Sequence, residues 1–218
     1  MNAVTPFTGG AVIAHNPVSN LRLGSGIMPF RRIRDRGIPV CLGVDEAIAG
    51  DAVDMWGVAK TAGLIHTITD TDHDRWPTAT EVLHCATAGG ARAMGLADSL
   101  GAIAPGRLAD LALLDLDTLA FTPLNDLHRQ LVYCETGSSV RLTMVAGRVV
   151  FETGRLTTID EAALRAEARD IFARRAPALA EARRAMDRWL PAYRAMTAQA
   201  AARDVGLTRS AIDRPHPG

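Results

Sequence analysis

The stretches IAHNPVSNLRLGSG at residues 13–26 and VCLGVD at residues 40–45 decide the fold of this chain. Each overlaps a short apolar run, over 11–14 in the first case and over 39–43 in the second, that predicts a buried strand. A helix is predicted between them, over 27–36. A strand, a helix and a second strand in this order predict parallel neighbours and an α/β fold.

Two further helices are predicted after the second strand. Residues 52–65 have apolar side chains at helical spacing, and residues 80–94 carry another helix with Thr78 or Thr80 as its N-cap. The segment between these helices, 66–77, is polar, acidic and rich in turn-forming residues. We therefore expect it to be a surface loop.

The pattern changes after about residue 100. Strands are predicted over 109–116, 140–145 and 148–152, and Ala146-Gly147 is a compact hairpin signal between the last two.

An Ala/Arg-rich helical region then opens at residues 158–161. Pro177 and Pro191 should each kink or restart it, so two or three helices are expected rather than one.

Composition favours an ordinary globular protein. The 218 residues are 48% hydrophobic and 22% charged with a net charge of zero, so nothing indicates a nucleic-acid partner. Neither a signal segment nor an apolar stretch long enough to span a bilayer is evident, and we expect a cytoplasmic protein without a membrane partner. Cys41, Cys85 and Cys134 are odd in number and without a CxxC pair, which predicts buried free thiols.

Three motifs occur in a fixed order along residues 11–155. They are His15-x-Pro-x-Ser-Asn followed by Leu-Arg-Leu-Gly-Ser-Gly, then Leu-Gly-x-Asp ending at Asp45, then the run from Gly101 to Leu111. Together they resemble the amidohydrolase superfamily, in the branch of guanine deaminase, cytosine deaminase-like enzymes and triazine hydrolases. The resemblance implies a (β/α)8 barrel with a divalent metal, zinc or iron, at the C-terminal ends of its strands.

The resemblance also assigns roles to four residues. Asp45 matches the strand-eight aspartate, which approaches or ligates the metal, takes a proton from the attacking water and passes it to the leaving group. His15, Ser19 and Asn20 match the strand-seven motif and would lie on the substrate side. The alternative is that His15 and Asn20 only secure the strand-to-helix turn by hydrogen bonds. Glu46 adds a negative charge that we expect to raise the pKa of Asp45.

The sequence lacks the other metal ligands of the family. It contains no His-x-His, and Lys60 is its only lysine, so the carbamylated-lysine form of the site is excluded as well. His66 and His73 lie in the polar loop and are expected to be solvated, while His84 is expected to be a packed or surface histidine. A catalytic zinc site needs about three protein ligands, so we expect one subunit to lack a complete site and not to retain the metal alone.

The resemblance divides the chain into four parts. Residues 1–100 would be a partial barrel with the last two strands and following helices, 101–159 a β-sandwich-type segment, 160–202 C-terminal helices and 203–218 a tail.

Three hypotheses follow for the function. The first is the C-terminal part of a hydrolase of carbon–nitrogen bonds other than peptide bonds, acting on a small purine, pyrimidine or triazine-like heterocycle. It would be truncated or joined by an N-terminal complementing partner. The second is a non-catalytic scaffold or binding subunit, and the third a complete enzyme with a novel site. An apolar set on the C-terminal helices indicates a homo-oligomer, or else packing on the rest of the chain.

Overall fold

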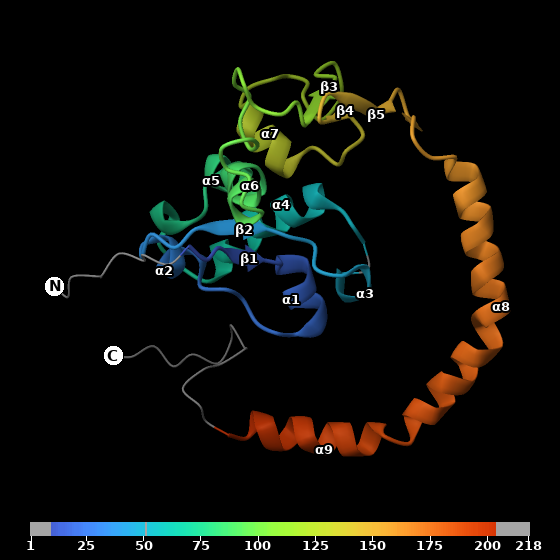
Figure 1. Ribbon diagram of the computed structural model, residues 1–218. Coiled ribbons are helices and arrows are strands. Elements are labelled where there is room, and N and C mark those ends of the chain that lie inside the picture. Colours follow the sequence, from blue (N-terminus) through green and yellow to red (C-terminus); the bar gives the residue numbers. More distant parts are fainter. Residues whose placement is uncertain (1–9, 51, 204–218) are drawn as a thin grey trace. The chain divides into compact units, whose positions relative to one another are not determined.

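The computed structural model describes residues 10–50 and 52–203, which divide into two units at residue 155 (Figure 1). The first unit mixes short strands with helices, which agrees with the expected α/β class. Its helices and strands are β1 (Ile13–His15), α1 (Pro17–Leu23), α2 (Phe30–Arg34), β2 (Val40–Leu42), α3 (Ala47–Gly50), α4 (Met55–Ile65), η1 (His66–Ile68), η2 (His73–Arg75), α5 (Ala79–Ala86), α6 (Ala88–Ala93), β3 (Leu111–Leu114), α7 (Leu127–Tyr133), β4 (Val140–Val145) and β5 (Arg148–Glu152).

The strands β1 and β2 are parallel neighbours, as predicted, and their register places His15 opposite Leu42. All three residues of β2 are buried because α4, α5 and α6 pack against this strand (Figure 1). A strand covered in this way can be continuously apolar, as Val-Cys-Leu is here. The parallel pair is therefore the centre of the core, whose buried members are Phe30, Val40, Leu42, Val58, Ala59, Ala62, Ala79, Val82, Cys85 and Val132.

Two predicted helices are shorter than the sequence pattern suggested. The helix expected over 27–36 begins only at Phe30, because Pro29 disfavours a helical conformation at the residue before it. The helix expected over 80–94 is interrupted at Thr87, where the backbone has φ −112° and ψ −84°. Thr78 caps α5 in a reciprocal capping box with Glu81, which confirms the first of the two predicted caps.

The three strands predicted after residue 100 are present and antiparallel. Strands β3, β4 and β5 pair in that order, and β4 and β5 have the predicted bounds. The turn between them has positive φ at both Ala146 and Gly147, as a tight hairpin requires. Asp110 accepts a hydrogen bond from the Ala146 backbone N–H at 2.7 Å, so this aspartate stabilises the hairpin turn.

The second unit comprises β6 (Arg155–Leu156), α8 (Glu161–Asp187) and α9 (Leu190–Ala201). Asp160 caps α8 by accepting from the Ala163 N–H at 3.0 Å. The prediction of more than one helix is confirmed, and Pro191 lies in the first turn of α9. Helix α8 nevertheless runs through Pro177; because the helix is exposed, solvent can satisfy the carbonyl group that the proline leaves without a donor.

Neither α8 nor α9 has a buried residue. The apolar set predicted on them is exposed, with fractions of 41% to 67%, and consists of Ile171, Phe172, Leu179, Met186, Trp189, Leu190, Tyr193 and Met196. The expectation that this set contacts a second copy or the rest of the chain stays a prediction. Most of the tail expected over 203–218 lies outside the described residues.

The cysteine prediction is confirmed in part. Cys41 and Cys85 are buried free thiols, and burial raises the pKa of Cys85 to about 11. Cys134 is exposed, so the expectation that all three are buried is wrong for it. It follows α7 as its C-cap residue, where the chain has left the buried face of that helix.

The close contact between α6 and β2 generates a stability prediction. A Cβ atom at Gly89 would lie 2.5 Å from the Val40 carbonyl oxygen, whereas one at Gly90 would meet nothing within 4 Å. We expect Gly89→Ala to lower the free energy of unfolding by about 1–3 kcal/mol, because backbone must shift to admit the methyl group. Gly90→Ala is the matched control and should be neutral or stabilising by up to about 1 kcal/mol. Urea unfolding followed by circular dichroism measures both, and equal effects would contradict the packing described.

Candidate functional site

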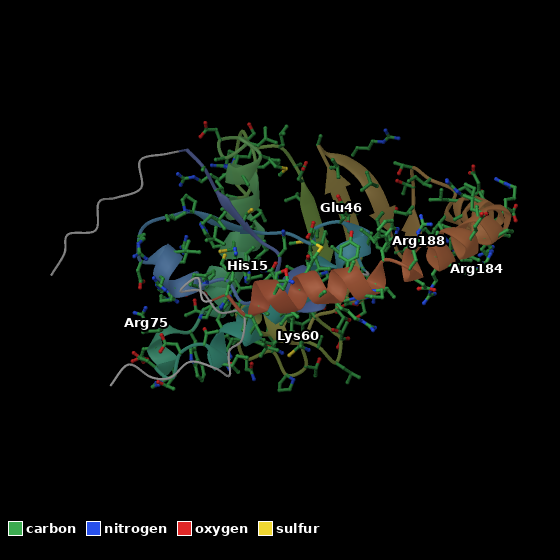
Figure 2. The ribbon with its side chains drawn as sticks, turned by 90° about the horizontal axis from the view of Figure 1, so that it is seen from below. His15, Glu46, Lys60, Arg75, Arg184 and Arg188 are labelled. Atoms are coloured by element: carbon green, nitrogen blue, oxygen red, sulfur yellow. The ribbon has the colours of Figure 1, made fainter. Side chains whose placement is uncertain are left out.

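The carboxyl ends of β1 and β2 form the edge at which the predicted residues gather. His15 ends β1, and the chain leaves β2 through Gly43, whose N–H donates to the His15 carbonyl at 3.0 Å. A Cβ atom at position 43 would lie 2.4 Å from Asn16 Oδ1, so the Asn16 side chain would have to move to admit a larger residue there. Asp45 follows two residues later, and Glu46, which is labelled in Figure 2, comes next in the chain.

Both carboxylate oxygens of Asp45 are held by hydrogen bonds. The Ser19 hydroxyl donates to Oδ2 at 2.6 Å, and the Glu46 backbone N–H donates to Oδ1 at 2.8 Å. Ser19 is itself buried on α1, so its hydroxyl is a fixed donor. Asp45 has φ +63°, a left-handed conformation that aspartate tolerates better than most residues. The carboxylate is thus exposed but oriented.

These hydrogen bonds overturn the expected effect of Glu46. The bond from Ser19, followed by that from the Glu46 N–H, lowers the pKa of Asp45 below its ordinary value. The expectation that Glu46 raises this pKa is therefore wrong, because Glu46 acts on Asp45 through its backbone donor. Asp45 is ionised at neutral pH.

His15 forms a buried pair with His66. Their Nε2 atoms are 3.0 Å apart, and the two rings are 2% and 4% exposed as whole residues. Phe30 packs beside both rings, with centroids 6.5 Å from His15 and 5.2 Å from His66. Figure 2 shows His15 among the side chains of this region. The His15 ring therefore contacts another imidazole instead of securing the turn at its own strand end.

The solvated state expected for His66 is wrong. His66 follows α4 and continues its buried stripe of Val58, Ala59, Ala62 and Gly63, at one more helical turn. That spacing is a signal in the sequence that could have identified its burial. His73 is exposed as expected, and His84 lies on the exposed side of α5.

Both histidines are neutral at physiological pH. Burial is the largest cause, and it lowers the pKa of each ring to about 4. Repulsion between the protonated rings adds to the effect on His15, and the charge of Arg31 adds to the effect on His66. One ring donates from Nε2 and the other accepts, so their Nδ1 atoms comprise one acceptor and one donor. Both Nδ1 atoms are buried and have no hydrogen-bond partner among the described residues.

Arg31 fixes the segment 66–77 that was expected to be an ordinary surface loop. Its guanidinium donates to the carbonyl groups of Arg75 and Trp76 at 2.9 and 3.1 Å and forms a two-pronged ion pair with Glu81. Arg75 pairs in turn with Asp70 at 2.9 Å. The segment is exposed in places but contains η1 and η2 and is anchored to α2 and α5.

Asn20 is placed differently from the other three candidates. Its backbone carbonyl accepts from Ser25 N at 2.9 Å and from Gly24 N, which ends α1. Asn20 therefore secures the turn by its main chain. The structure brings Ser19 and Asp45 into contact, joins His15 to His66, and leaves Asn20 in the helix end.

The described residues do not fit a complete metal site. No three His, Cys, Asp or Glu side chains in 10–50 and 52–203 lie together in a way that could hold a metal ion. The His15 and His66 Nε2 atoms are directed at each other, and Asp45 offers one ligand at most. The prediction that this chain alone does not retain a metal stays a prediction.

Comparison with known proteins supports the resemblance to the amidohydrolase family. The amidohydrolase family model matches residues 4–150. The 5-methylthioadenosine/S-adenosylhomocysteine deaminase of Nitratidesulfovibrio vulgaris is 41% identical over 162 residues, covering 74% of this chain and 36% of that protein. The 5'-deoxyadenosine deaminase of Methanococcoides burtonii is 37% identical over 149 residues, covering 68% of this chain and 34% of that protein.

Solved structures show the same likeness. An adenosine deaminase from Xanthomonas campestris with bound zinc is 32% identical, with a TM-score of 0.72, over 75% of this chain and 37% of the other. A zinc complex of the atrazine chlorohydrolase TrzN from Arthrobacter aurescens is 30% identical, with a TM-score of 0.69, over 76% of this chain and 38% of that protein. The chain thus spans little more than a third of the length of these relatives.

The histidine pair generates a pH prediction. Because each folded-state pKa lies near 4 and the unfolded value near 6.5, the unfolded chain binds more protons between these values. Stability should therefore fall as the pH is lowered from about 6.5 to about 4, by on the order of 3 kcal/mol or more for the pair. Urea unfolding across this window measures the loss.

Two variants assign that loss to the pair. His66→Leu should flatten the profile over this window, because only one buried imidazole remains to be protonated. His73→Gln is the matched control, since His73 is exposed, and it should keep the wild-type slope. A wild-type profile that stays level from pH 6.5 to 4 would contradict the buried neutral pair.

Proposed function

The chain belongs to the amidohydrolase family, and we propose that it is the C-terminal portion of a hydrolase of carbon–nitrogen bonds other than peptide bonds. In this proposal β1 and β2 are the last two strands of the (β/α)8 barrel, and β3, β4 and β5 belong to its β-sandwich domain. The parallel register of β1 and β2 supports the first assignment. The substrate class is a purine, pyrimidine or triazine-like heterocycle, supported by the deaminases and triazine hydrolases that the chain resembles.

The oriented carboxylate of Asp45 is the main support for the proposed hydrolase function. An ionised carboxylate whose two oxygens are fixed can accept a proton at a defined position and return it. In the reaction, a water oxygen bonds to the ring carbon while Asp45 takes a proton from that water. Asp45 then gives the proton to the amino nitrogen as the carbon–nitrogen bond breaks and ammonia leaves.

Ser19 positions the Asp45 carboxylate, and this role rests on their 2.6 Å hydrogen bond. His15 and Asn20 are proposed to lie beside the substrate, as the family motif implies. For His15, the neutral ring is a hydrogen-bonding group rather than a charge. For Asn20, only the side chain is free for such a contact, because its backbone carbonyl ends α1.

The zinc-bound relatives support a divalent metal in the family. Because the described residues do not form its site, we propose that histidines from outside this chain complete it. An N-terminal complementing partner or a homo-oligomer is the proposed assembly, and the exposed apolar side chains of α8 and α9 support an association of this kind.

A non-catalytic scaffold or binding subunit is the second candidate function. The absence of a three-ligand cluster among the described residues favours it. It differs from the first in one respect that can be measured, because a scaffold would assemble with a barrel partner without conferring hydrolysis.

No helix among the described residues is long and apolar enough to cross a membrane. The cytoplasmic location stays a prediction.

Complementation tests the proposed function. The chain is co-expressed with the part of the Nitratidesulfovibrio vulgaris relative that precedes the matched region, and the purified complex is supplied with zinc. Ammonia release is then followed with 5-methylthioadenosine, S-adenosylhomocysteine, adenosine and guanine as substrates. We expect release from at least one of them, and Asp45→Asn should reduce the rate by roughly 100-fold or more because the proton carrier is lost.

Glu46→Gln is the matched control, since it removes a neighbouring exposed carboxylate but keeps the backbone donor to Asp45. Its rate should stay close to that of the wild type. An assembled complex that releases no ammonia would favour the scaffold, and an Asp45→Asn complex with the wild-type rate would refute the role of Asp45.

A further inference from the structure

A pocket of about 300 Å³ lies at the opposite end of β2 from Asp45. Its wall is formed where β2 begins, at Val40, and where α6 packs against that strand at Gly89. The end of α2, helix α5 and the segment 97–107 complete it. None of the four candidate residues at the carboxyl end of the strands lines it, so it is separate from the proposed catalytic edge.

The lining of this pocket is basic. Arg34, Arg92, Arg107 and His84 contribute to it, and none of the described residues that line it is acidic. Among nearby acidic residues, Asp35 is paired with Arg75 and Glu81 with Arg31. Asp98 lies in the adjoining segment without lining the pocket. The positive charge of the three guanidinium groups is therefore not balanced within the pocket.

The three guanidinium groups retain donors for a ligand. Arg107 donates from Nη1 to the carbonyl groups of Ala97 and Leu100 at 2.7 and 2.6 Å, which holds it in place. The Arg34 Nε atom is buried and has no hydrogen-bond partner among the described residues. Because a buried donor without an acceptor costs free energy, the protein itself leaves the Arg34 guanidinium incompletely satisfied.

Two glycines in the wall of the pocket allow neighbouring backbone segments to pack closely together. A Cβ atom at Gly89 would lie 2.5 Å from the Val40 carbonyl oxygen, and one at Gly101 would lie 2.8 Å from the Ala88 Cα atom. These contacts are with main-chain atoms, which cannot move aside easily to admit a side chain. The basic side chains thus surround a wall that is fixed by packing, and a pocket of this volume suits a small solute.

We propose that this pocket binds a small phosphate-class anion, either inorganic phosphate or the phosphate group of a small monoester. The planar donors of arginine match the oxygen atoms of phosphate, and several arginines around one cavity are typical of recognition of such dianions. Binding here does not depend on the proposed hydrolysis, because the pocket and the catalytic edge share no lining residue.

Calorimetric titration of the 218-residue chain tests the site. Sodium phosphate and glycerol phosphate are titrated separately at low ionic strength in a chloride-containing buffer, which distinguishes the free ion from the monoester. We expect saturable binding of one anion per chain. Arg92→Gln should weaken it by roughly tenfold or more, because a charged donor is removed.

Arg32→Gln is the matched control, since Arg32 is also exposed but does not line the pocket, and it should leave the affinity unchanged. Ala102→Glu, which places a carboxylate at the lining, should abolish binding and gives a second test should Arg92→Gln fail to fold. Unsaturable binding of both anions, equal weakening by Arg92→Gln and Arg32→Gln, or binding of an acidic peptide without either anion would overturn the proposal.

Discussion

The parallel pairing of two three-residue strands is the constraint on which the first unit depends. Strand β2 is buried throughout, and helices from three later parts of the chain pack against it. Such short strands are stable only when they are covered, so the pairing and the helices require each other. Gly89 meets this requirement at the start of β2, because a Cβ atom there would lie 2.5 Å from the Val40 carbonyl oxygen.

The pairing also separates two chemical environments. At the carboxyl end of the strands, Ser19 and the Glu46 N–H hold an ionised carboxylate, while the nearby imidazole pair is kept neutral by burial. At the other end of β2, arginines surround a pocket without an acidic lining. Negative charge is thus fixed at one end and positive charge at the other, although the whole chain has a net charge of zero.

Local patterns in the sequence predicted most of the elements. Apolar runs identified β1, β2, β4 and β5, and the cap at Thr78 and the hairpin at Ala146-Gly147 follow from turn and capping preferences. The motifs identified the family because several residues recur together in order, which no single one of them could do.

Contacts between distant residues were not predictable in this way. His66 lies 51 residues from His15, so local patterns could not predict that the two rings meet, although the helical spacing of His66 from Ala62 was a signal of its burial. The pKa of Asp45 depends on Ser19, which is 26 residues away, whereas the neighbouring Glu46 suggested the opposite shift. The exposure of Cys134 could not be predicted from its neighbours either, because it depends on where α7 ends.

Asp45 is an oriented carboxylate, and we propose that it belongs to an amidohydrolase site that the described residues do not complete. The zinc content of the purified 218-residue chain, measured by elemental mass spectrometry after dialysis against zinc and then against metal-free buffer, tests it most directly. We expect clearly less than one zinc per chain, and the same low content for Asp45→Asn. One tightly retained zinc per chain that is lost in Asp45→Asn would contradict it, because the chain would then hold a complete metal site of its own.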